Sequence, residues 1–104
     1  MSGVTLVDGL ATANPADGDG PRVERLFAGA GATVVRLTFR AGQRMDDHKA
    51  GRPILVSVQS GDVEFGFDDR LEHLTPGSVA HVDAGVVHRL IAQTDAVATL
   101  VVLR

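Results

Sequence analysis

Hydrophobic and polar residues alternate with a period of two along several short stretches of the chain. The clearest stretch is Ala32 to Arg40, in which Val35, Leu37 and Phe39 share one face and the intervening residues share the other. Ile54 to Gln59 repeats the pattern. Alternation of this kind predicts antiparallel strands with one buried face.

Turn residues divide the rest of the chain into further short stretches rich in branched side chains. No segment sustains the 3.6-residue period of a helix. The pattern therefore predicts an all-β fold, a barrel or jelly roll of about nine short, mostly antiparallel strands. Besides the two stretches above, strands are expected at Arg22–Ala28, Val63–Phe67, Leu71–Leu74, Ser78–Val82, Val86–Ala92 and Val97–Leu103, with Val4–Leu10 as a possible edge strand.

Residues 1–21 differ from the rest because turn-forming residues fill their second half, Asn14 to Pro21. They are interpreted either as an N-terminal arm or as an edge strand. A chain of 104 residues has room for one domain. Residues 22–104 are therefore expected to form a single β-barrel domain.

Composition narrows the function classes. The chain has no cysteine, which excludes disulfides, zinc–thiolate sites and thiol catalysis. A net charge of −3 argues against nucleic acid as a partner, because binding phosphates needs a clustered positive surface. No apolar run approaches the roughly 20 residues that span a bilayer, and no secretory signal opens the chain, so no membrane partner and a cytoplasmic location are expected.

Four of the twelve glycines and two of the four histidines stand at specific distances from one another along the chain. His48 stands six residues after Gly42, and Gly61 follows later; His88 stands three residues after Gly85 and eleven after Gly77. This skeleton resembles the two sequence motifs of the cupin superfamily, a family of small conserved β-barrels. The resemblance implies a barrel over roughly residues 32–103 and a metal site inside it.

The metal site that the resemblance implies is incomplete. Of its four usual ligand positions, His48 and His88 keep a ligand, whereas Ala50 and Ile54 cannot coordinate a metal. Imidazoles suit a divalent transition metal such as Fe, Mn, Ni or Zn. A hairpin centred on Ala84-Gly85 would place His81 opposite His88 as a substitute ligand; otherwise the two strands belong to facing sheets.

Two functional hypotheses follow for the barrel interior. In the first, Ile54 and Val56 line an apolar pocket with His48, His81 and His88, and the protein is a small-molecule-binding or scaffold module. Arg52, at the entrance to a strand, could then hold the anionic group of a carboxylated ligand. In the second, the protein is a metal-dependent enzyme, dioxygenase- or isomerase-like, that uses His48, His88 and a substitute ligand such as His81.

A third hypothesis concerns the outside of the barrel. The stretches Val86–Ile91 and Ala96–Leu103 are apolar on both faces. A strand with two apolar faces needs a partner on each side, and one of these can be another subunit. The resemblance also implies a homodimer, which is therefore expected.

Overall fold

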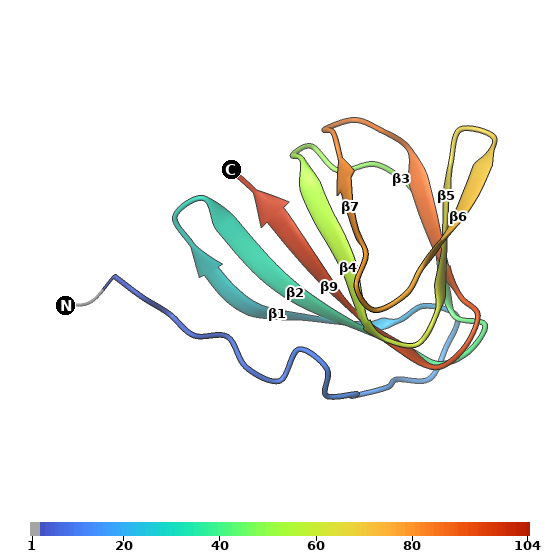
Figure 1. The fold of residues 1–104 in the computed structure, drawn as a ribbon, viewed down its shortest axis with the longest axis horizontal. Helices are drawn as coiled ribbons and strands as arrows, with labels where there is room; N and C mark the ends of the chain where they lie inside the picture. The colour runs from blue at the N-terminus through green and yellow to red at the C-terminus, as the bar shows by residue number, and fades with distance from the viewer. Residues whose placement is uncertain (1–2) are drawn as a thin grey trace.

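The computed structural model describes residues 3–104, and these residues form nine strands and no helix (Figure 1). The all-β prediction is confirmed. No helix in this part of the chain is long and apolar enough to cross a membrane. The strands are β1 (Arg22–Gly29), β2 (Ala32–Phe39), β3 (Arg44–His48), β4 (Ile54–Ser60), β5 (Val63–Phe67), β6 (Arg70–Leu74), β7 (Val79–Val82), β8 (His88–Ala92) and β9 (Ala96–Leu103).

The strands form two antiparallel sheets. The five-stranded sheet has the order β1-β2-β9-β4-β7, and the four-stranded sheet has the order β3-β8-β5-β6. Consecutive strands β7 and β8 belong to different sheets, so the connection between them crosses the barrel. The edge strands β6 and β7 are joined by the short turn 75–78 (Figure 1).

The core lies between the inner faces of the two sheets. The β2–β9 register sets Leu37 opposite Ala98 and Phe39 opposite Ala96, so large residues on one strand meet small ones on the next. All four side chains are at most 2% exposed. The faces predicted from the alternation are the buried ones, since Val35, Ile54, Val56 and Val58 also belong to the core.

Two segments differ from the expectation. Residues Arg44–His48 form β3, although their polar sequence RMDDH gave no strand pattern. They are an edge strand that pairs only with β8, and Arg44 and Asp46 are exposed, which explains the missing alternation. Val4–Leu10 contains no strand; residues 3–21 form an extended arm that lies outside the five-stranded sheet (Figure 1).

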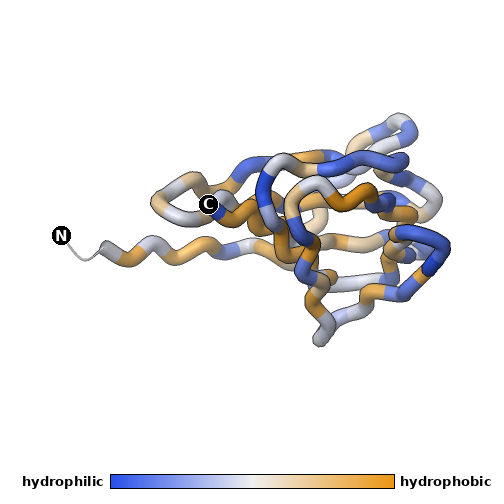
Figure 2. The backbone as a smooth tube through the Cα atoms, turned by 90° about the horizontal axis from the view of Figure 1, so that it is seen from above, coloured by the Kyte–Doolittle hydropathy of each residue, from blue (hydrophilic) through white to orange (hydrophobic). Residues whose placement is uncertain are grey.

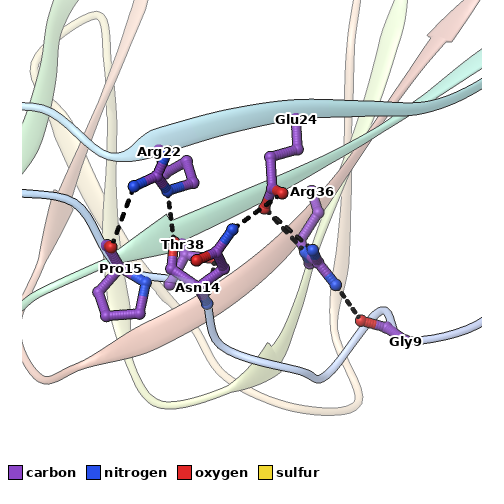
Figure 3. A network of polar contacts seen from close by, with 7 residues as sticks. All are labelled: Gly9, Asn14, Pro15, Arg22, Glu24, Arg36 and Thr38. Atoms are coloured by element: carbon purple, nitrogen blue, oxygen red, sulfur yellow. Dashed lines mark hydrogen bonds and ion pairs between the residues drawn. The ribbon is translucent and has the colours of Figure 1, made fainter.

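Polar contacts fix the middle of the arm to the outer face of β1 and β2 (Figure 3). The backbone N–H of Asn14 donates to Thr38 Oγ1 at 3.2 Å, and its side-chain amide donates to Glu24 at 3.0 Å. The Arg36 guanidinium donates both to Glu24 and, at 2.7 Å, to the carbonyl of Gly9. The arm is therefore held at Gly9 as well as at Asn14.

Gln43 fixes the other end of the arm. Its side chain is buried, and its amide nitrogen donates to the carbonyls of Ala16 at 2.7 Å and Gly18 at 3.0 Å. Its amide oxygen accepts the backbone N–H of Arg40 at 2.8 Å. Residues 9–18 are thus bound to the barrel at both ends, while residues 3–8 extend beyond it.

Candidate ligand-binding cleft and histidine pair

The pairing of β3 with β8 sets His48 directly opposite His88. The two ring centroids are 4.3 Å apart, with 59° between the ring planes. The His88 side chain is only 1% exposed, and its ring stacks on Phe65 at 5.8 Å. The structure therefore brings together the two histidines that were predicted from sequence to meet inside the barrel.

Both histidines have the same hydrogen bond. Nδ1 of His48 lies 2.7 Å from the carbonyl oxygen of Asp46, and Nδ1 of His88 lies 2.9 Å from that of Val86. A carbonyl oxygen only accepts hydrogen bonds, so Nδ1 donates and each Nε2 of the neutral ring keeps its lone pair. Burial is the main cause that lowers the pKa of His88, and the neighbouring His48 also lowers it, while the hydrogen bond that His88 donates to the Val86 carbonyl raises it.

The side chains present do not complete a metal centre. A catalytic metal usually takes at least three protein ligands, and the two Nε2 atoms supply two. The other implied positions carry Ala50 and Ile54, and Ile54 belongs to the apolar core. Across residues 3–104 no group of three histidine, aspartate or glutamate side chains is placed to hold a metal ion.

His81 does not join the histidine pair. It lies on β7, opposite Leu55 of β4, and therefore in the sheet that faces His88. The neighbouring Val82 is buried, so alternation turns His81 outward; its side chain is 52% exposed, with Nδ1 3.9 Å from Asp83. The hairpin considered from the sequence is absent, because the segment after Val82 crosses to the other sheet.

A cleft of about 440 Å³ opens between β5–β6 and the edge strand β7. Its walls are mainly apolar and aromatic, and two charged side chains of β6 stand at its edge. Arg70 forms an ion pair with Glu72, and its guanidinium lies over the Phe67 ring at 5.3 Å. The lining residues are Phe65, Phe67, Arg70, Glu72, Leu74, Ala80, His81, Val82 and Val86.

Most of the pocket residues that were expected from the sequence do not line the cleft. Ile54 and Val56 are buried opposite Val82 and Ala80, so they support the wall from the next strand. Arg52 is exposed in the connection between β3 and β4 and does not line the cleft. Of the six expected residues, only His81 lines it.

Sequence reasoning missed the two phenylalanines of the cleft. Phe65 and Phe67 stand two residues apart on β5, so the period-two pattern placed them on one face. The pattern did not tell whether this face points into the barrel. The register with β8 does, because Phe65 pairs with the buried Leu90 and Phe67 with the buried His88. The strand Val63–Phe67 was predicted correctly. The two phenylalanines on one face of it were the signal in the sequence that could have pointed to the cleft.

No family model matches the chain, and no curated protein matches it. Solved structures do. An RmlC-like cupin protein from Desulfovibrio desulfuricans is 22% identical, with a TM-score of 0.84 over 96% of this chain and 97% of that one. A Klebsiella pneumoniae protein with a double-stranded β-helix domain is 22% identical, with a TM-score of 0.80 over 99% and 90%.

A third solved structure agrees with these two. A cupin superfamily protein from Desulfitobacterium hafniense is 17% identical, with a TM-score of 0.77 over 95% of this chain and 98% of that one. The fold expected from the glycine and histidine spacing is thereby confirmed as the cupin barrel. Identities in this range concern the fold and leave the activity to be argued from the site.

Proposed function

We propose that this chain, which has the fold of the cupin proteins, is a binding module for a small, mainly apolar molecule that carries an anionic group. The observation that carries the proposal is the cleft between β5–β6 and β7, with its apolar walls and the Arg70 guanidinium at its edge. Its volume of about 440 Å³ lies within the range of small-molecule sites.

The charged edge favours an anionic end group on the ligand. Arg70 has five N–H donors, and one of its nitrogens is paired with Glu72. The side chain is 63% exposed, so its remaining donors can reach a carboxylate or sulfonate at the mouth of the cleft. The apolar body of the same molecule would then lie against Phe65 and Phe67.

The histidine pair supports binding in preference to metal chemistry. His88 lies directly behind Phe65, and the pair supplies two nitrogen lone pairs where a catalytic metal site needs three ligands or more. The enzyme hypothesis required a third ligand such as His81 beside His48 and His88. Because His81 points away from this pair, the hypothesis keeps only two ligands. A plain scaffold role, by contrast, gives no reason for an open apolar cleft with a cation at its edge.

The cleft can be tested with two dyes of the same skeleton. We expect 1-anilinonaphthalene-8-sulfonate and its neutral analogue N-phenyl-1-naphthylamine both to bind, with a rise in fluorescence. Val86→Glu places a carboxylate among the lining residues and should weaken binding of the anionic dye about tenfold. Arg70→Gln should weaken the anionic dye and leave the neutral one unchanged.

Val87→Glu is the matched control, because Val87 is the next residue, is 49% exposed and does not line the cleft. It should change the dissociation constant of either dye less than about twofold. Equal weakening by Val86→Glu and Val87→Glu would place the dye outside the cleft. Failure of the wild-type protein to bind either dye would leave the scaffold role as the better explanation.

Metal loading tests the enzyme hypothesis directly. After incubation of the untagged protein with Fe²⁺, Mn²⁺, Ni²⁺ or Zn²⁺ and removal of free ions by gel filtration, we expect less than one bound ion per chain, because two imidazoles hold a metal weakly. Elemental analysis gives the ratio. One ion per chain, absent from both His48→Ala and His88→Ala, would contradict the expectation and restore the enzyme hypothesis.

A further inference from the structure

The cleft between β5–β6 and β7 contains two opposite charges on one strand. Arg70, Glu72 and Leu74 alternate along β6 and therefore share a face, and all three line the cleft. Leu71 and His73, on the other face of β6, do not line it. The cleft therefore presents a guanidinium and a carboxylate side by side next to its apolar walls.

Each of the two charges stands beside an aromatic ring. The register of β5 with β6 sets Phe67 opposite Arg70 and, two residues away, Phe65 opposite Glu72. The Arg70 guanidinium lies over the Phe67 ring at 5.3 Å. Its Nη2 lies 2.5 Å from Oε1 of Glu72. The ring and the carboxylate therefore both orient the guanidinium.

A ligand with an anionic group alone would use only one of these charges. Its carboxylate would pair with Arg70 but would also lie next to the Glu72 carboxylate, and like charges at short range repel. The third titratable side chain of the cleft, His81, lies on β7, with its Nδ1 3.9 Å from Asp83. A ligand that pairs with both charges of β6 needs an anion and a cation close together.

We propose that the ligand of the cleft is a free α-amino acid with a large apolar side chain. This inference rests on the proposed binding function and names the class of ligand. The carboxylate of the amino acid pairs with Arg70, and its ammonium group pairs with Glu72. Its side chain lies against Phe65 and Phe67. An α-amino acid has its two charges on one carbon, so it matches a guanidinium and a carboxylate that are themselves in contact.

The charged end of such a ligand would stay near solvent. The side chains of Arg70 and Glu72 are exposed, whereas Phe65 is buried. Hydrophilic positions gather at the end of the molecule away from the N-terminus (Figure 2), which is the end where Figure 1 places the β5–β6 hairpin. The ammonium and carboxylate groups therefore remain partly hydrated while the apolar side chain leaves water, which limits the cost of desolvating the charges.

Three indole compounds with one carbon skeleton test the pairing. Tryptophan has both charges, indole-3-propionate lacks the ammonium group, and tryptamine lacks the carboxylate. The chain has no tryptophan and no tyrosine, so the fluorescence of a bound indole can be measured without an indole or phenol background from the protein. Fluorescence anisotropy should show that tryptophan binds about fivefold more tightly than either analogue, because only tryptophan pairs with both charges.

Glu72→Gln removes one charge of the cleft and keeps the size of the side chain. It should weaken the binding of tryptophan and tryptamine about fivefold and strengthen that of indole-3-propionate about twofold. Glu64→Gln is the matched control. Glu64 precedes the buried Phe65 on β5, so it points to the opposite face, and it does not line the cleft. This variant should bind all three compounds like the wild type.

A preference for tryptophan that is lost in Glu72→Gln and kept in Glu64→Gln would support the inference. Equal binding of tryptophan and indole-3-propionate by the wild type would overturn it, as would equal effects of the two substitutions. The two dyes described above separate this failure from that of the binding function. If the dyes bind in the cleft and tryptophan does not displace them, only the amino-acid inference fails. If neither the dyes nor the indoles bind, both proposals fail.

Discussion

Gly61→Ala should lower the free energy of unfolding by about 3 kcal/mol, through backbone strain and a steric clash together. Gly61 forms the turn between β4 and β5 with a φ of +83°, a conformation that side chains rarely adopt. A Cβ there would lie 2.3 Å from the carbonyl oxygen of Asp95 and 2.8 Å from Ala96. Because these are backbone and core atoms, they cannot simply swing aside.

Two other glycines separate the strain from the clash. Gly77 has a φ of +103° but open space where a Cβ would lie, so Gly77→Ala should cost only about 1 kcal/mol, through backbone strain alone. Gly51 has neither feature, so Gly51→Ala should be neutral within about 0.5 kcal/mol. Urea unfolding of all three at one protein concentration gives the order. If Gly61→Ala and Gly77→Ala lower the free energy of unfolding equally, the chain around Gly61 must move enough to relieve the clash with Asp95 and Ala96.

Phe65→Ala should lower the free energy of unfolding by about 3 to 4 kcal/mol, as expected for removing a buried aromatic ring. Phe65 is 5% exposed, contacts Phe67 at 5.5 Å between centroids and stacks on His88. Its loss connects the cleft with the histidine pair and admits water to His88. Because burial is the main cause of the lowered His88 pKa, that pKa should rise toward its ordinary value of 6.5.

The same shift predicts how stability depends on pH. Since the pKa of His88 is lower in the folded than in the unfolded protein, the unfolded chain binds more protons as the pH falls below 6.5. The contribution of His88 is complete above pH 6.5 and is lost as the pH falls toward the folded-state pKa. The pKa of His73 is raised by its hydrogen bond to Asp62, so that its contribution is lost above pH 6.5, in a separate window.

NMR titration of the histidine ring protons measures these values. In Phe65→Ala the His88 pKa should move up while the His73 pKa stays in place. Phe65→Leu keeps an apolar side chain in the same position, so it should leave the His88 pKa nearer that of the wild type and cost less stability. An unchanged His88 pKa in Phe65→Ala would show that the ring does not keep water from the pair.

Strands that face the core on one side were predictable because burial imposes a period of two. Ala32–Phe39 and Ile54–Ser60 match their predicted strands within one residue at each end. β3 was not predictable in the same way, because its exposed residues are polar and its pairing with β8 depends on distant residues. Edge strands of this kind are defined by their neighbours more than by their own sequence.

The candidate site was predictable only as far as spacing determines position. The resemblance that rests on the glycine and histidine spacing implied that His48 and His88 share one site inside the barrel, and the structure has their ring centroids 4.3 Å apart. The facing of His81 depends on which sheet β7 joins, and the cleft residues depend on the register of β5 with β6 and β8. One residue of register turns a side chain to the opposite face, so these features need the tertiary fold.

The position of the cleft between β6 and β7 has a mechanical consequence. Both are edge strands of different sheets, so no ladder of backbone hydrogen bonds closes the barrel between them. The turn 75–78 connects β6 and β7 at one end of the cleft and can act as a hinge. Widening this gap would therefore break no strand pairing, and if the cleft binds ligands as proposed, ligands of different thickness should be admitted at little cost in folding energy.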